Sequence, residues 1–449
     1  MPRGSRPLTV LFMPESAYGP TNNCIGIGAV LAARGHRVVF ASETSWRGRL
    51  EPLGFEEDLV ALAPPRDAGN PDPGAPDPGA SSDAGRFWTD FVKETAPFFR
   101  LPTLEQLEHF VQPTWRALLD GARFVQEQLL GVVGRQRPDV VVEDNVCAFP
   151  ALVTAGVPFV RVVSCNPLEV GGATVPPKFS GYPVADRTAW AAYRAEYERL
   201  HRELWCEFDE WVRACGAPGL GDLEFVHESE ALNLYVYPEV VDYTDRRPMG
   251  ERWHRLESCV RGTEGSPTPE LAEFLARPGG ALVYLSLGSL GSADVGLMER
   301  LVATLARTPH RYVVSKGPLA DDYELADNMW GASQVPQTQV LASVDLVVTH
   351  GGNNTTTECF HFGKPMVVLP LFWDQHDNAQ RVEETGFGRR LATYGHDDAQ
   401  LIGAVDGLLA DGALRARMAR LGAAIRARRG VERAATLIEE VARAGSVDA

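Results

Sequence analysis

A short apolar run followed directly by a glycine-rich polar turn constrains the fold of this chain more than any other segment. The run is Val344–Thr349, and the residues from His350 onward read His-Gly-Gly-Asn-Asn-Thr. An apolar run of this length beside glycines is typical of a buried parallel strand. Asn354 or Thr355 can cap a following helix, with Glu358 one turn further in. The pattern predicts a helix N-terminus whose free N–H groups bind an anion, most naturally phosphate.

A second apolar run, Pro365–Pro370, precedes an acidic and an amide side chain, Asp374 and Gln375. A carboxylate only accepts hydrogen bonds, whereas an amide both donates and accepts them. This pair is therefore suited to holding the hydroxyl groups of a sugar.

Length and charge narrow the class of protein. A chain of 449 residues exceeds the usual size of one domain and suggests two. A hydrophobic content of 45% with 23% charged residues is typical of a soluble globular enzyme. The formal net charge of −16 argues against nucleic acid or an anionic membrane as the main partner, although a local basic pocket remains compatible with it.

The cysteines and the hydropathy pattern predict where the protein works. The 7 cysteines are odd in number and scattered, which fits reduced thiols in the cytoplasm. No CxxC pair and no cluster with ligand spacing indicates a metal site. No signal-peptide core or long apolar stretch is present, so we expect a cytoplasmic protein without a membrane span. The oligomeric state stays open, with a homodimer as one option.

Two stretches of alternating apolar runs and helical segments predict an α/β protein with two domains. The first begins with an apolar run at 8–13, and after a loop we expect a helix to start at Cys24. The second restarts with a strand at 281–286, followed by Gly288 and Ser289 in a tight loop. Such alternation is required by a pair of Rossmann-like, doubly wound parallel sheets. We expect domains at 1–238 and 266–430, a linker at 239–265, and a final helix within 431–449. The Pro- and Gly-rich stretch 64–85 reads as a mobile loop, either a lid or disordered.

The stretch from Gln334 to Leu391 closely resembles the nucleotide-sugar signature of the inverting family 1 glycosyltransferases, which include bacterial macrolide and plant secondary-product enzymes. The matching segments are Pro336-Gln337, His350 to Glu358, Gly363-Lys364-Pro365 and Asp374 to Asn378. The resemblance implies the GT-B fold, in which two Rossmann-like domains face each other across a cleft. It implies a donor in the C-terminal domain, an acceptor in the N-terminal domain, and a last helix that crosses back. It also implies a nucleoside-diphosphate sugar as co-substrate, with no metal and no other cofactor.

The resemblance assigns roles to the donor residues. His350 would donate to the diphosphate, although a histidine that merely caps the strand end is the alternative. Glu358 would bind ribose hydroxyls, unless it is a solvated helix residue or half of a capping box. Asp374 and Gln375 would hold the sugar. The remaining donor-binding candidates are Gly288, Ser289, Gly352, Asn353, Asn354 and Thr355 at the phosphates, and Gln334, Val335 and Gln337 near the nucleobase.

One donor position departs from the family pattern. Family members place a tryptophan two residues before Pro336, where its ring stacks on the nucleobase, but this chain has Gln334. A neighbouring aromatic residue can substitute, or Gln334 and backbone groups hold the base alone. The choice between a uridine and a thymidine diphosphate sugar therefore stays open.

The catalytic histidine of the family is missing. Its position falls at about Pro20, and His36 belongs to the next strand. The aspartate that orients it is present as Asp144. One interpretation gives the base role to Asp144, Glu15 or Glu143, since burial can raise the pKa of a carboxyl group. Tyr18, which we assign to the catalytic site, would then orient the acceptor together with Asn22. Glu143 would lie beside the acceptor. In the second, an acidic acceptor needs no base, because general bases supply about 100- to 10,000-fold. In the third, the chain binds nucleotide sugars as the partner of another enzyme.

The aromatic stretch 87–115, with Phe87 and Trp88, and the helix 190–211 would line the acceptor pocket or belong to the core. A nucleotide-sugar epimerase would share the fold but is not expected to carry Asp374-Gln375 within this signature. A dehydrogenase is rejected, because Gly26-x-Gly28 is only a fragment of GxGxxG inside a helix. The sequence thus predicts an inverting, metal-independent transferase that moves a sugar from UDP or dTDP to a small molecule, such as a bacterial natural product.

Overall fold

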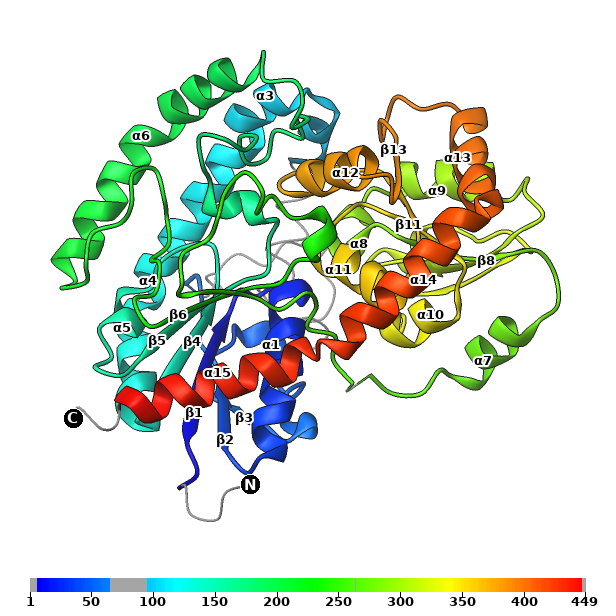
Figure 1. Ribbon diagram of the computed structural model, residues 1–449. Coiled ribbons are helices and arrows are strands. Elements are labelled where there is room, and N and C mark those ends of the chain that lie inside the picture. The colour runs from blue at the N-terminus through cyan, green and yellow to red at the C-terminus, as the bar shows by residue number, and fades with distance from the viewer. Residues whose placement is uncertain (1–5, 65–94, 263, 446–449) are drawn as a thin grey trace, which may run out of the picture.

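Two parallel β-sheets, each covered by helices, lie side by side in the computed structural model of the protein, which describes residues 6–64, 95–262 and 264–445 (Figure 1). All strand pairs within both sheets are parallel, which confirms the prediction of two Rossmann-like domains with the GT-B arrangement. Most of the stretch 64–85, together with Phe87 and Trp88, lies outside the described residues.

The N-terminal sheet has the strand order β3-β2-β1-β4-β5-β6-β7. Its strands are β1 (Thr9–Pro14), β2 (Arg37–Phe40), β3 (Glu56–Glu57), β4 (Val140–Asp144), β5 (Phe159–Val163), β6 (Leu232–Tyr235) and β7 (Trp253–Arg255). The central strands are apolar because helices cover both faces. On one face Val10 and Phe12 pack beneath α1 (Tyr18–Ala33) and α15 (Gly430–Gly445). The other face is covered by α4 (Gln112–Gln136), α5 (Pro150–Val153) and α6 (Trp190–Ala214).

The C-terminal sheet has the order β10-β9-β8-β11-β12-β13. Its strands are β8 (Leu282–Ser286), β9 (Arg311–Ser315), β10 (Met329–Ala332), β11 (Leu346–Thr349), β12 (Met366–Val368) and β13 (Gly388–Arg390). The helices of this half are α7 (Pro269–Ala276), α8 (Gly288–Gly291), α9 (Val295–Leu305), α10 (Gln337–Ser343), α11 (Asn353–Phe362), α12 (Gln375–Glu384), α13 (Asp398–Ala410) and α14 (Gly412–Ala427). The turn after β11 thus opens α11, as predicted from its sequence.

Two expected boundaries are wrong. The linker expected at 239–265 contains β7, which pairs with β6 and extends the N-terminal sheet to Arg255. A three-residue strand of Trp, His and Arg at the sheet edge has no apolar run by which to detect it. The first helix starts at Tyr18 rather than Cys24, because Pro20 is tolerated in a first helical turn where its missing N–H has no partner to lose.

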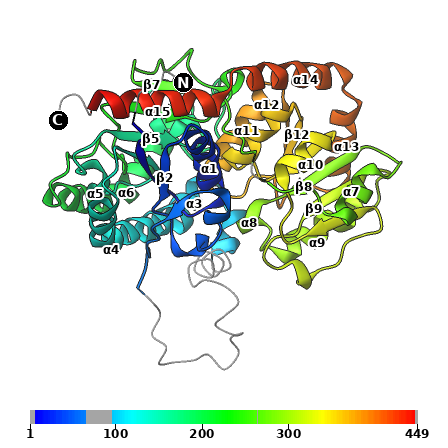
Figure 2. The same ribbon diagram turned by 90° about the horizontal axis from the view of Figure 1, so that it is seen from below.

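The last helix belongs to the N-terminal domain. Figure 2 shows α14 over the C-terminal domain and α15 over the N-terminal domain. Ala434, Ala435, Ile438 and Ala442 are buried on the face of the sheet that α1 also covers. The chain therefore returns to its first domain at the end, as the family resemblance implies.

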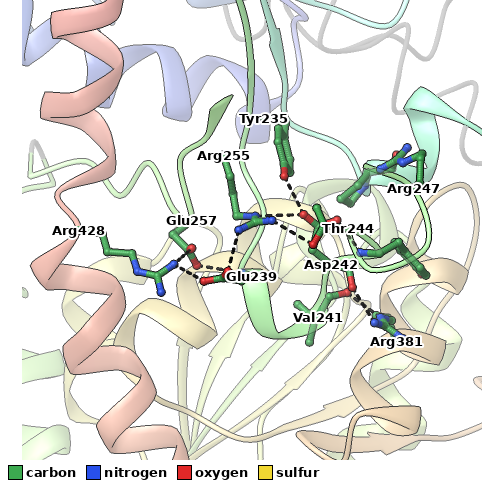
Figure 3. Close-up of polar contacts among 12 residues, drawn as sticks. Tyr235, Glu239, Val241, Asp242, Thr244, Arg247, Arg255, Glu257, Arg381 and Arg428 are labelled. Atoms are coloured by element: carbon green, nitrogen blue, oxygen red, sulfur yellow. Dashed lines mark hydrogen bonds and ion pairs between the residues drawn. The ribbon is translucent and has the colours of Figure 1, made fainter. Parts of the chain in front are cut away.

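A polar network joins the domains beside this crossing (Figure 3). Arg428, between α14 and α15, forms an ion pair with Glu239 at 2.7 Å and another with Glu257. Arg381 of α12 donates hydrogen bonds to the carbonyl oxygens of Val241 and Asp242, both at 2.7 Å. The segment after β6 is thereby held by α12 and by the junction between α14 and α15.

Candidate active site between the domains

The turn between β11 and α11 leaves a helix N-terminus uncapped. Gly351 has a φ of 86°, which glycine adopts readily, and Gly352 is the N-cap. No side chain caps α11, so the expected capping by Asn354 or Thr355 is wrong. Both residues lie within the first turn instead. The free N–H groups at this end suit an anion.

His350 lies between two glycines at this turn. A β-carbon on Gly288 would lie 2.8 Å from His350 Nε2, and one on Gly352 would clash with the same atom. The imidazole is therefore packed between the starts of α8 and α11. Burial lowers the pKa of His350 to about 4, so its imidazole ring is neutral at pH 7. Ser289 is exposed at the start of α8, on the same edge of the sheet.

Glu358 is buried at the centre of a hydrogen-bond network. Its carboxylate accepts from Arg261 Nη1 at 2.8 Å, Gln337 Nε2 at 2.6 Å and Asn354 Nδ2 at 3.0 Å. With 1% of its surface exposed, Glu358 is not a solvated helix residue. Arg261 also pairs with Glu264, which balances its charge. Nothing in the local sequence marked Arg261, because its partner is distant along the chain.

Asp374 contacts the opposite domain. Its carboxylate accepts the backbone N–H of Asn166 at 2.9 Å, and burial raises the pKa of Asp374 to about 7. Asn166 follows β5, and its side chain also donates to Asn378 at 2.8 Å. The side-chain oxygen of Gln375 accepts the N–H of Leu371 at 3.0 Å and so holds its own loop. Asn166 is a second site residue that the sequence did not reveal.

The loop before Asp374 is anchored in aromatic side chains of the N-terminal domain. Phe372 packs against Phe99, with ring centroids 4.8 Å apart. Trp373 packs against Phe179 at 4.2 Å and Trp115 at 5.2 Å, with a φ of 56° that is rare for a side chain of this size. Trp115 is fully buried and therefore belongs to the core rather than to a pocket wall.

Asn353 makes a further contact between the domains. Its amide donates to the carbonyl oxygen of Val236 at 3.1 Å. The turn that would hold phosphate therefore touches the N-terminal domain directly. Val335 is half-buried against the core of its own domain.

Glu15 and Asp144 lie together at the ends of β1 and β4. The backbone N–H of Glu15 donates to the carbonyl oxygen of Asp144 at 2.8 Å. Asp144 is 2% exposed and accepts from Ser164 Oγ at 2.5 Å, and burial raises its pKa to about 7. Glu15 is half-buried, and desolvation raises its pKa as well. Glu15 is thus the carboxylate of this pair that a substrate can reach.

Glu143 does not fit the expected acceptor role. Successive residues of a strand point to opposite faces, so Glu143 faces away from Asp144. Its side chain is 0% exposed, and neither carboxylate oxygen has a hydrogen-bond partner among the residues described. Its neighbour on β5 is Arg161. Asn22 is half-buried in α1.

Tyr18 reaches the other domain. It is the first residue of α1, and 41% of its surface is exposed. Its hydroxyl accepts hydrogen bonds from Arg49 Nη1 at 2.7 Å and from Gln334 Nε2 at 3.3 Å. Tyr18 therefore lies beside the residue that aligns with the nucleobase contact.

The first turns of α6 line a cavity. Tyr193, Arg194 and Tyr197 form one wall, and Lys178 and Glu224 lie opposite them around a space of about 420 Å³. Part of the helix expected at the acceptor pocket thus borders open space, while its buried face packs into the core.

Two further searches cover only the residues that the structure describes. No group of three or more His, Cys, Asp or Glu side chains there has the arrangement of a metal site. None of the helices in those ranges is both long and apolar enough to cross a membrane.

Comparison with known proteins agrees with this geometry. Residues 299–439 match the model of the "Erythromycin biosynthesis protein CIII-like, C-terminal domain". Demethyllactenocin mycarosyltransferase of Streptomyces fradiae is 25% identical over 96% of this chain and 86% of its own length. Oleandomycin glycosyltransferase of Streptomyces antibioticus is 25% identical over 96% of this chain and 90% of its own length.

Solved structures share the fold over the whole chain. The glycosyltransferase of kitacinnamycin superposes with a TM-score of 0.68 at 23% identity, covering 97% of this chain and 100% of that one. The glycosyltransferase VinC, solved with dTDP, has a TM-score of 0.61 at 17% identity, covering 97% and 100%. With the signature residues gathered at one edge of the C-terminal sheet, these solved structures show that the chain has the GT-B fold, and the relatives to which it is similar over most of its length are glycosyltransferases.

Proposed function

We propose that the protein transfers a sugar from a UDP- or dTDP-sugar to a small-molecule acceptor, with inversion at the anomeric carbon and without a metal. The observation that carries this proposal is the convergence of His350, the uncapped start of α11, Glu358 and Asp374 at the ends of β8, β11 and β12. The printed names of the relatives support a bacterial natural product as the acceptor. A cytoplasmic location stays a prediction.

The chemistry is a single displacement. Glu15 takes the proton of the acceptor hydroxyl as its oxygen attacks the anomeric carbon. The bond from that carbon to the phosphate oxygen breaks on the opposite face, and the nucleoside diphosphate leaves with the electron pair. A diphosphate beside His350 favours its protonated form, which together with the start of α11 stabilises the charge of the leaving group. Burial, with the negative charge of Glu43, raises the pKa of Glu15 and so its tendency to hold a proton.

The test is product formation from defined substrates. Purified protein is incubated with UDP- and dTDP-sugars and with alcohol, phenol and carboxylic acid acceptors, and mass spectrometry records a sugar-sized gain. We expect gain on plain alcohols, because Glu15 provides a base, and an inverted anomeric configuration by NMR. Gain confined to acidic acceptors would remove Glu15 from the mechanism. Nucleotide-sugar binding with no transfer to any acceptor would favour a partner of another enzyme.

The contact between Glu358 and Arg261 predicts how strongly the ribose 2′-hydroxyl of the nucleotide affects binding. The carboxylate already accepts three hydrogen bonds, so it does not need the ribose 2′-hydroxyl as a donor. We expect UDP and dUDP to bind with dissociation constants within about 3-fold of each other, because the lost contact is worth little here. Arg261→Met frees one acceptor site, and UDP should then bind about 10-fold more tightly than dUDP.

Isothermal titration calorimetry with UDP and dUDP measures the contribution of the 2′-hydroxyl to binding, because the two ligands differ only in that group. A tenfold preference of the unmodified protein for UDP would contradict the proposal that Arg261 satisfies Glu358. Arg307→Met, which alters an exposed ion pair with Asp398, serves as the control for removing a positive charge.

A further inference from the structure

The position that stacks on the nucleobase in the family has no aromatic ring in this chain. Gln334 is exposed between β10 and α10, and an amide side chain offers no extended face for stacking. Its Nε2 donates to the hydroxyl of Tyr18, a residue of the opposite domain, at 3.3 Å. An aromatic ring is therefore present at this place, supplied from across the cleft.

Tyr18 is both exposed and held in place. Arg49 donates to its hydroxyl at 2.7 Å, and the ring of Trp46 lies 5.4 Å away at an angle of 60°. Trp46 is 6% exposed, and its indole N–H donates to the carbonyl oxygen of Ser16 at 2.9 Å. One side of the Tyr18 ring is thus supported by Trp46 and Arg49, while 41% of the residue's surface stays open. A ring fixed in this way loses little freedom when a ligand stacks on it.

The ring also lies next to the turn that would hold the diphosphate. A β-carbon on Gly19, the residue after Tyr18, would lie 3.4 Å from Cβ of Asn354 in the first turn of α11. The starts of α1 and α11 therefore meet at the cleft. A base joined through its ribose to a phosphate at α11 comes within reach of Tyr18.

Other aromatic rings near Gln334 belong to the C-terminal domain. Trp330 lies in β10, four positions before Gln334, but its side chain packs against the hydrophobic core. Tyr323 is 4% exposed and Tyr284 is 1% exposed. Among the described aromatic residues near Gln334, Tyr18 combines an exposed face with a direct contact to that residue.

We propose that Tyr18 of the N-terminal domain stacks on the nucleobase of the donor, in the role that a tryptophan at the position of Gln334 fills elsewhere in the family. This inference rests on the proposed use of a nucleoside-diphosphate sugar. The base enters between Tyr18 and Gln334 and replaces their hydrogen bond, and the Gln334 amide meets its polar edge. Both donor and acceptor groups of that amide match the imide edge shared by uracil and thymine. Donor binding then requires both domains at once.

Calorimetric titration with dTDP, and with inorganic pyrophosphate as a ligand without a base, tests this role. Tyr18→Ala should weaken dTDP binding by about 10- to 100-fold, the usual effect of removing one stacked ring. Tyr18→Phe keeps the ring and should stay within about 3-fold of the unmodified protein, since stacking needs no hydroxyl. Pyrophosphate binding should be the same in all of them. Adding Gln334→Trp to Tyr18→Ala should restore dTDP affinity from the other side of the cleft.

Two variants serve as controls. Phe124→Ala removes an aromatic residue that is 39% exposed on α4, and it should leave dTDP binding unchanged. Trp330→Leu should also leave the affinity for dTDP unchanged. If Trp330→Leu lost dTDP affinity while Tyr18→Ala kept it, the inference would be overturned. Equal losses of dTDP and pyrophosphate affinity in Tyr18→Ala would overturn it too, because they would indicate a disturbed cleft rather than a lost stacking contact. If the unmodified protein binds no nucleoside diphosphate, the proposed function itself fails.

Discussion

Glu15→Gln is expected to lower kcat by about 100- to 10,000-fold on an alcohol acceptor, the usual contribution of a general base. The amide keeps the size and the acceptor oxygen of the side chain but cannot take a proton. Desolvation raises the pKa of Glu15, so its carboxyl group is protonated and inactive at low pH. The kcat/KM of the unmodified enzyme should therefore rise with pH through that raised pKa. This rise should be absent from the pH profile of kcat/KM of Glu15→Gln.

Asp144→Asn is the matched comparison. Asp144 is almost fully buried and contacts Ser164, so it does not act directly on the acceptor. If Glu15 is the base, Asp144→Asn should keep the rising limb of the pH profile where it is and reduce kcat much less than Glu15→Gln. A larger loss in Asp144→Asn than in Glu15→Gln would assign the base role to Asp144.

Asp374→Ala is expected to reduce kcat/KM for the sugar nucleotide by about 100-fold or more. Hydrogen bonds to a charged group are worth about 1.5–3 kcal/mol each, and a carboxylate can hold two sugar hydroxyls. Burial raises the pKa of Asp374 to about 7, and hydroxyl donors from the sugar favour the ionised form. The affinity for free dTDP should not change, because this nucleotide carries no sugar at that position.

Comparing sugar nucleotide with free nucleotide separates a lost sugar contact from a damaged fold. Asp374→Asn preserves an acceptor for the Asn166 N–H and should retain more activity than Asp374→Ala. Undiminished turnover in Asp374→Ala would remove Asp374 from the donor site.

Local sequence patterns predicted most of the strands and helices, but they did not predict the contacts between segments that are distant in sequence. The strand-turn-helix at His350 was readable because its apolar run and glycines are consecutive in sequence. The contacts of Arg261 with Glu358 and of Asn166 with Asp374 could not be predicted in this way, because each pair is brought together only when distant segments pack. Those two contacts decide how the donor residues are held.

Two misplacements have physical causes of a different kind. Glu143 was expected beside the acceptor, although the alternation of side chains along a strand already separates it from Asp144. The early start of α1 at Tyr18 was hidden by a glycine and a proline, which usually indicate a loop. That shift matters, because it brings Tyr18 to the cleft as the start of a rigid helix.

The crossing of α15 has a consequence for synthesis of the chain on the ribosome. The apolar face made by β1, β4 and α1 is completed by Ala434, Ala435 and Ile438, which are translated after the entire second sheet. The first domain therefore emerges with an uncovered hydrophobic surface and waits for the second to be made. This face of the first domain is completed only after the second domain has been made, and until then its exposed apolar surface favours aggregation.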